Sequence, residues 1–262
     1  MIRFIQYKTL KNLCVGIILL LVTNVPFANP RHHTYHHTYQ NTKESLFLSK
    51  LSKKTLQIQQ HVFHNLVHQP ISDPLTLKAI ATIVDEYRFN KQAMRICRDI
   101  SGCFVQFPPA GGKNLARAKQ KAERTGGYQY VLDYSRLTVI VPYTSLFVTL
   151  DRIADIWDYQ NIIWINDRIT HHLSGYRDIQ LYVKDSDSGL ISEILILSPT
   201  MTSAKYGKGH QLYEKSRKIE AKAVSEKRNL TPTEKQIVKK YNEKMKQLYD
   251  TAHLAAVSSI NN

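Results

Sequence analysis

The chain has 262 residues, of which 43% are hydrophobic and 22% charged, the usage of an ordinary globular protein large enough for one sizeable domain or two small ones. Its 10 glycines and 9 prolines exclude a collagen-like or broadly disordered chain. The 36 lysines and arginines against 21 acidic residues give a net charge of +15. Polyanionic partners are therefore favoured: nucleic acid, nucleotides or an anionic membrane surface.

Residues 1–28 have the pattern of a secretory signal peptide. Three cations and no acidic residue precede an apolar run over residues 13–22, and small residues close the segment at Ala28. The run is well short of the ~20 residues that span a bilayer. We expect a periplasmic or secreted protein with no stable membrane span after signal cleavage; an uncleaved signal anchor is the alternative.

The next segments predict an arm and then helices. Residues 29–44 contain His-His-Thr-Tyr twice and show no apolar periodicity, which indicates a flexible arm. A helical pattern begins at Ser45 and predicts a helical N-terminal extension over residues 45–75. A further helix is expected over residues 75–94.

Two cysteines remain after signal cleavage, Cys97 and Cys103, with five residues between them. In an oxidising compartment they are a candidate disulfide that closes a short loop. Two unpaired thiols are the alternative. A zinc site is not expected, because a second close pair of ligands is missing.

The remainder of the chain alternates between helical and strand periods. We expect helices over residues 115–124 and 145–157, and strands over residues 130–141, 161–165, 178–183 and 190–197, the last two joined by a turn at 185–189. From about residue 202 the chain reads as helical, with Pro232 separating two Lys-rich helices. This order predicts an α+β fold with a mixed β-sheet flanked by helices.

Lys113, Arg117 and Lys121 recur every four residues after the Gly111-Gly112 turn, so they share one helix face. A basic face beside a glycine turn suits a polyphosphate, through charge-assisted hydrogen bonds and the helix N-terminus. A solvated basic face has the same pattern and is the alternative.

Two acidic residues in strands are candidates for metal and acid–base chemistry. Asp133 enters the strand that contains Arg136, and a carboxylate there suits Mg²⁺, which takes a few carboxylates together with phosphate oxygens. Glu193 lies within an apolar strand, where it is either a solvated side chain, a second metal ligand or a general base. Tyr176, directly after a glycine, offers a ring for base stacking.

The order of these segments resembles the synthetase domain of the RelA/SpoT family, in particular its toxin-like and accessory branch. The matching residues are Lys113 to Lys121, Asp133 with Arg136, Gly175-Tyr176-Arg177-Asp178, Glu193, and Gly209-His210-Gln211-Leu212-Tyr213-Glu214. The resemblance covers about residues 76–225. It implies a nucleotidyltransferase-like synthetase fold, with helical extensions over residues 45–75 and 226–262.

The resemblance also implies an activity and roles for the matching residues. The activity is that of a pyrophosphokinase, which moves pyrophosphate from ATP to a 3′-hydroxyl, with Mg²⁺ as cofactor and Asp133 and Glu193 as its ligands and catalytic residues. The residues that would bind ATP are Lys113, Arg117, Lys121 and Arg136. Those that would bind the acceptor are Tyr176, Arg177 and His210.

The chain departs from the family pattern at three positions. Gln180 stands where the family has His, and Leu195 and Leu197 stand where it has Gln and Arg. Polar contacts to a guanosine acceptor are thereby lost, so adenine nucleotides and an RNA 3′ end are also candidate acceptors. The expected function is an exported pyrophosphokinase, a toxin or effector in guanosine tetraphosphate-type nucleotide metabolism. The alternative is a degenerate module of the same fold that binds nucleotides, nucleic acid or anionic surfaces.

Overall fold

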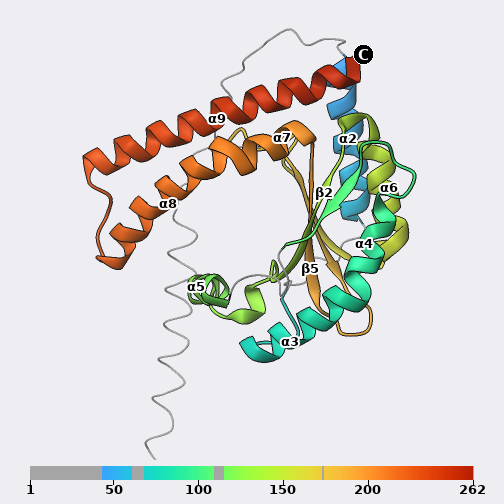
Figure 1. The fold of residues 1–262 in the computed structure, drawn as a ribbon, viewed down its shortest axis with the longest axis horizontal. Helices are drawn as coiled ribbons and strands as arrows, with labels where there is room; N and C mark the ends of the chain where they lie inside the picture. Colours follow the sequence, from blue (N-terminus) through green and yellow to red (C-terminus); the bar gives the residue numbers. More distant parts are fainter. Residues whose placement is uncertain (1–42, 61–67, 109–114, 173, 262) are drawn as a thin grey trace, which may run out of the picture. The chain divides into compact units, whose positions relative to one another are not determined.

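The computed structural model describes residues 43–60, 68–108, 115–172 and 174–261 (Figure 1). The expected signal peptide, almost all of the expected arm, the Gly111-Gly112 turn and Lys113 lie outside the described residues. The described residues belong to one compact unit that covers residues 41–262. Within them, no helix has the length and apolar character needed to cross a bilayer.

The fold is built on a five-stranded mixed sheet in the order β1-β2-β5-β4-β3. Its strands are β1 (Phe104–Gln106), β2 (Ser135–Ile140), β3 (Ile162–Asp167), β4 (Ile179–Lys184) and β5 (Ile191–Leu197). β2 and β5 are parallel and the other neighbours are antiparallel. The expected α+β class with a mixed sheet is therefore confirmed.

Helices flank the sheet on both sides, and Figure 1 shows α3, α4 and α6 on one side with α5 and α8 on the other. The α-helices are α2 (Lys43–Gln60), α3 (Pro74–Val84), α4 (Asn90–Ile96), α5 (Leu115–Thr125), α6 (Leu146–Trp157), α7 (Pro199–Ala204), α8 (His210–Ser225) and α9 (Pro232–Asn261). Shorter segments are the π-helical η1 (Asp85–Phe89) and η5 (Lys205–Gly209) and the 3₁₀ turns η2 (Tyr128–Tyr130), η3 (Tyr143–Ser145) and η4 (Tyr159–Asn161).

Strand alternation gives the sheet one aliphatic face. Leu137 of β2, Leu181 of β4 and Ile194 of β5 point to this face, and each is at most 1% exposed. They pack in one core with apolar side chains of α2, α3, α4 and α6. Because successive strand side chains point to opposite faces, the polar residues between them are left on the other face.

The expected N- and C-terminal extensions contribute to this same core. Phe47 and Leu51 of α2 and Ala256 and Val257 of α9 are all buried in it. Helices α2 and α9, which lie within the expected extensions, are therefore integral parts of the folded unit.

Most expected elements lie within a few residues of the observed ones, but two begin at other residues than expected and one observed strand was not expected. The strand expected over residues 130–141 starts only at Ser135, because Gly126 and Gly127 take positive φ angles and a 3₁₀ turn follows them. The last helical region begins at Pro199, where Ser198 caps the helix by accepting a hydrogen bond from the Met201 N–H. The short strand β1 was not expected.

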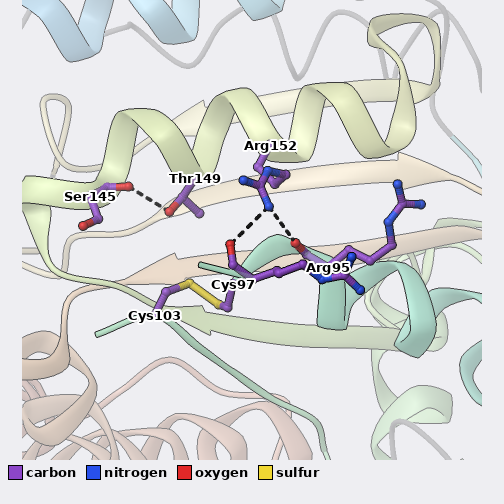
Figure 2. Close-up of a disulfide and its surroundings, with 7 residues drawn as sticks. Arg95, Cys97, Cys103, Ser145, Thr149 and Arg152 are labelled. Atoms are coloured by element: carbon purple, nitrogen blue, oxygen red, sulfur yellow. Dashed lines mark hydrogen bonds between the residues drawn. A yellow bond between two sulfur atoms is a disulfide. The ribbon is translucent and has the colours of Figure 1, made fainter. Parts of the chain in front are cut away.

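A disulfide joins Cys97, at the end of α4, to Cys103, which precedes β1 (Figure 2). The two Cα atoms are 5.1 Å apart. Arg152 of α6 donates to the carbonyl oxygens of Arg95 at 3.3 Å and Arg98 at 3.2 Å. These bonds tie the C-terminal end of α4, beside the disulfide, to α6.

Replacing both Cys97 and Cys103 by serine is expected to lower the free energy of unfolding by about 2 kcal/mol, since the bridge closes a short loop and removes little entropy from the unfolded chain. Urea unfolding with and without reductant measures this. Reductant lowers the stability of the wild type to that of the variant and leaves the variant unchanged. Equal stability of the two proteins without reductant contradicts the prediction.

Candidate active site

The polar face of the sheet carries the candidate site. In the register of the sheet, Glu193 of β5 is paired with Arg136 of β2 on one side and with Tyr182 of β4 on the other. Tyr182 in turn is paired with Trp164 of β3, and the two rings stack with centroids 5.4 Å apart. A carboxylate, a cation and two aromatic rings therefore lie in one row across four strands.

Glu193 is only 6% exposed. The amide nitrogen of Gln180 donates to Oε1 of Glu193 and also to the hydroxyl oxygen of Tyr182, at 3.1 Å. Burial and then the negative charge of Asp133 raise the pKa of Glu193, while Gln180 and nearby cations oppose the rise. A raised pKa makes this carboxylate a stronger base, as expected for a group that accepts a proton.

Asp133 lies before β2, and it too is largely buried, at 9% exposure. Lys121 of α5 forms an ion pair with it, with Nζ 2.7 Å from Oδ1. The ammonium of Lys121 and the guanidinium of Arg136 both lower the pKa of Glu193, so the two carboxylates share one electrostatic environment. The structure thus brings together Asp133, Glu193, Lys121 and Arg136, all predicted from the sequence.

The predicted residues Arg117 and His210 lie at the rim of this site. Glu214 of α8 is 3.6 Å from the guanidinium of Arg117 on α5 and 4.0 Å from Nε2 of His210. Arg117 is 66% exposed and His210 53%, so these ion pairs are weak. They nevertheless bring the basic face of α5 and the start of α8 into contact. The third expected cation of the basic face, Lys113, lies outside the described residues.

A second charged group occupies the other end of the polar face, where β4 begins. Arg168 donates two hydrogen bonds to Asp178, of 2.5 and 2.7 Å, and Asp178 is fully buried. The ring of Tyr176 lies beside them, with the Arg168 guanidinium 5.7 Å and the Lys205 ammonium 5.5 Å from its centroid. Lys205 comes from η5, which follows α7.

Other side chains already engage Tyr176 and Arg177, which were expected to bind the acceptor. Tyr249 of α9 packs against the ring of Tyr176, with centroids 5.3 Å apart, so a base can stack there only if a neighbour moves. Arg177 is 7% exposed and turns away from the polar face to bind Asp250 at 2.9 Å and His172 at 2.7 Å. The guanidinium of Arg177 thus joins the segment before β4 to α9, and its expected role in acceptor binding stays a prediction.

The aliphatic residues of β5 have a packing role. Leu195 and Leu197 point to the same face as Glu193 and pack against Met201 of α7 and Tyr249 and Ala252 of α9. Helices α7 and α9 therefore cover the end of the face where β5 finishes, and the end with Glu193 keeps its polar residues. These two leucines, which depart from the family pattern, supply the apolar surface on which α7 and α9 pack.

The site suits a magnesium ion by the chemistry of its donors. Two hard carboxylate ligands, Asp133 and Glu193, are buried together, and Mg²⁺ is commonly held by one or two carboxylates plus substrate phosphates. Within the described part of the chain, no cluster of three or more His, Cys, Asp or Glu side chains forms a complete protein cage for a metal. A metal here would complete its coordination with phosphate oxygens and water.

A groove lies elsewhere on the described residues. It measures about 610 Å³, lies between α8 and α9, and includes Leu212, Leu248 and Ala255 in its lining. None of the predicted site residues lines it.

Sequence reasoning did not identify Tyr182, Trp164 or Lys205 as site residues. Tyr182 could have been predicted from the hairpin, because counting back from the turn at Asp185 pairs Tyr182 with Glu193. The position of Lys205 could not be predicted from the sequence, because it depends on the π-helical segment and on non-helical φ and ψ angles at Gly207.

Buried carboxylates surrounded by cations on a mixed sheet are typical of metal-dependent phosphoryl-transfer sites. No family model matches the sequence, and no curated protein matches it. Among solved structures, a GTP pyrophosphokinase family protein from Streptococcus pneumoniae is 20% identical, with a TM-score of 0.40 over 70% of this chain and 87% of that one. The small alarmone synthetase 2 from Bacillus subtilis is 15% identical, with a TM-score of 0.46 over 72% and 94%.

A third similar structure is the complex between the Type VI effector Tas1 and its immunity protein, at 18% identity and a TM-score of 0.41 over 78% of this chain and 97% of the matched one. The names of these proteins agree with the resemblance expected from the sequence, to synthetases and to an effector.

The cover formed by α9 is held by a buried histidine. The hydroxyl of Tyr143 is 3.1 Å from Nδ1 of His253, and Nε2 is 3.5 Å from the Glu44 carboxylate. Burial, followed by the charge of Arg177, lowers the pKa of His253 to about 4. Since an unfolded histidine has a pKa of about 6.5, the unfolded state binds more protons between these values, and acidification destabilises the fold.

We expect the His253 contribution to stability to fall by about 2 kcal/mol between pH 7 and pH 5. The measurement is urea unfolding of the wild type and of His253→Gln at both pH values, because glutamine keeps an acceptor for Tyr143 and does not titrate. The wild type loses about 2 kcal/mol more than the variant. Equal losses contradict the prediction.

Proposed function

We propose that the chain is a pyrophosphokinase that transfers pyrophosphate from ATP to the 3′-hydroxyl of a nucleotide or RNA acceptor. The observation that carries the proposal is the convergence of Asp133 and Glu193 in one buried, electrostatically coupled site. Two neighbouring buried carboxylates are costly unless a ligand or metal uses them. Cations lie beside them: Lys121 pairs with Asp133, and Lys121 and Arg136 lower the pKa of Glu193.

In the proposed reaction, a bond forms between the acceptor O3′ and the β-phosphorus of ATP. The bond between the β-phosphorus and the oxygen bridging to the α-phosphate breaks, and AMP leaves with the electron pair. Glu193 accepts the hydroxyl proton. Because Gln180 already holds Oε1 of Glu193, the other carboxylate oxygen is the one that faces the acceptor or a metal. Positioning and charge stabilisation supply most of the catalysis in such a transfer.

The cations around the site have separate tasks. Lys121 and Arg136 line the side of Asp133 and would hold the donor phosphates, with Arg117 at the rim. Mg²⁺ held by Asp133 and Glu193 would neutralise charge on the phosphates. Lys121 now pairs with Asp133, so the same ammonium keeps that carboxylate compensated before the substrate binds.

We expect Glu193→Gln and Asp133→Asn each to lower transfer by at least about 100-fold, which is the size of a lost general base or metal ligand. The assay incubates the full chain with Mg²⁺, β-labelled ATP and GDP, GTP, ADP, AMP or bulk tRNA as acceptor. Glu123→Gln, an exposed carboxamide change on α5, is the matched control and retains activity.

If Glu193→Gln transfers pyrophosphate as fast as the wild type, the role assigned to this carboxylate is wrong. Absence of transfer to every acceptor, with ATP still bound, favours the degenerate binding module over the enzyme.

We also propose that the protein is exported and acts as a toxin or effector. The signal-like segment over residues 1–28 and the disulfide between Cys97 and Cys103 support export, since disulfides persist in oxidising compartments. Because ATP is scarce outside cells, the reaction would take place after delivery into another cytoplasm.

Residues 1–28 fused to a reporter enzyme that is active only outside the cytoplasm are expected to yield an active, soluble reporter beginning at Asn29. N-terminal sequencing and cell fractionation measure this. Activity that stays in the membrane fraction, with residues 1–28 retained, supports the signal anchor instead. A reporter that remains inactive contradicts export by this segment.

A further inference from the structure

The groove between α8 and α9 takes no part in the proposed chemistry, since none of the predicted site residues lines it. Figure 1 shows the two helices side by side as a hairpin. The residues of the groove recur at helical spacing on both of its sides. Lys208 of η5 is followed by Leu212 and Lys215 of α8, and α9 presents Lys244 and Leu248. Each side of the groove is therefore one continuous stripe along the chain.

The groove has an apolar floor and basic rims. Leu212 and Leu248 are half-buried in it and Ala252 is buried, whereas its lysines are exposed. Among the described residues that line the groove there is no acidic and no aromatic side chain. Its volume of about 610 Å³ is that of a site which holds a ligand or a few side chains of a partner.

The lysines of the rims differ from other lysines of the hairpin. Lys222 and Lys239 each lie close to a glutamate four residues further on. Within the described part of the chain, the rim lysines Lys208, Lys215 and Lys244 have no ion-pair partner of this kind. Uncompensated positive charge therefore lies beside apolar surface, a combination that is complementary to a partner both acidic and apolar.

The chain does not itself supply such an occupant. The residues outside the described ranges, which are 1–42, 61–67, 109–114, 173 and 262, contain no aspartate or glutamate. A second copy that docked groove to groove would place lysines against lysines. The charges therefore favour a separate, acidic partner.

The shape of the groove suits a helix. From Lys244 to Ala255 the stripe on α9 extends over about 16 Å, which is about three turns of a partner helix. A helix that enters such a groove places its apolar side chains at i, i+3, i+4 and i+7 on the floor. Single-stranded nucleic acid is a poorer fit, because grooves that bind it combine cations with aromatic rings for stacking. A membrane surface does not enter a concave groove.

We propose that the groove between α8 and α9 binds an acidic amphipathic helix of a separate protein. Apolar side chains of that helix lie against Leu212 and Leu248, and its carboxylates pair with the rim lysines Lys208, Lys215 and Lys244. The apolar contact supplies most of the affinity, and the charges select the partner. This binding does not depend on transfer activity.

The test measures binding of labelled probes to the full chain. The main probe is a helical peptide of about three to four turns, with leucines at i, i+3, i+4 and i+7 and glutamates at its other positions. One control peptide has lysines in place of the glutamates, and another has the same composition with the leucine spacing scrambled. Polyuridylate, vesicles of phosphatidylcholine and phosphatidylserine, and a peptide of residues 29–42 test other occupants. Sedimentation measures self-association.

We expect the glutamate peptide to bind and both control peptides to fail. The double variant Lys215→Gln/Lys244→Gln weakens binding about 3- to 20-fold, and this loss shrinks as salt is raised. Leu248→Ala weakens binding about 10-fold through lost apolar contact. The matched control, Lys222→Gln/Lys239→Gln, removes the same charge from the same two helices outside the groove and leaves binding unchanged. Thermal unfolding shows that each variant is folded.

Failure of the glutamate peptide to bind, or equal binding of the glutamate and lysine peptides, overturns the proposal. So does binding that neither Leu248→Ala nor Lys215→Gln/Lys244→Gln weakens. If the glutamate peptide fails while polyuridylate, vesicles or the peptide of residues 29–42 bind in a manner that depends on these residues, the groove belongs to that occupant instead. Self-association that Leu248→Ala abolishes assigns the groove to a second copy of the chain.

Discussion

Asp133 and Glu193 are two buried carboxylates of like charge, and the surrounding residues have to compensate that charge. Each is less than 10% exposed, and each makes the other more costly to ionise. The fold meets this cost from three elements: α5 supplies Lys121, β2 supplies Arg136, and β4 supplies the Gln180 amide. A mixed sheet in which β2 and β5 are parallel is what lets these side chains share one face. The aliphatic core beneath this face holds them in register.

The same face changes character along β5. Polar residues accompany Glu193, whereas Leu195 and Leu197 belong to a small second core under α7 and α9. Helix α9 is fastened to that end by the Arg177–Asp250 ion pair and by His253. The two leucine departures from the family pattern therefore mark where helices pack and leave the carboxylates at the opposite end intact. The loss of polar partners along β5 bears on how the proposed acceptor is held, and it leaves in place Asp133 and Glu193, the residues proposed to carry the transfer.

The α+β class and the hairpin of β4 and β5 were predictable because they depend on local period and spacing. The group of Asp133, Glu193, Lys121 and Arg136 was expected only from the resemblance to the synthetase family, since local spacing does not bring residues of separate elements together. Strand β1 was not, since three residues give no alternation to detect. The orientation of Arg177 was not predictable either: sequence spacing gives its position beside Tyr176, but Asp250, 73 residues away, decides which way it points. Contacts between distant segments decide such cases, and a single sequence does not contain them.

The net charge of +15 attracts polyanions, but most of it carries no information about a particular ligand. On α9, exposed lysines such as Lys239 and Lys246 pair with acids four residues further on, which gives solvated surface charge of little energetic weight. Lys205 differs because it is desolvated and lacks such a partner within the described residues. A charge that is costly where it stands identifies a binding site more sharply than many charges that cost nothing. By that criterion, the informative cations of the chain are those on the polar sheet face around Glu193.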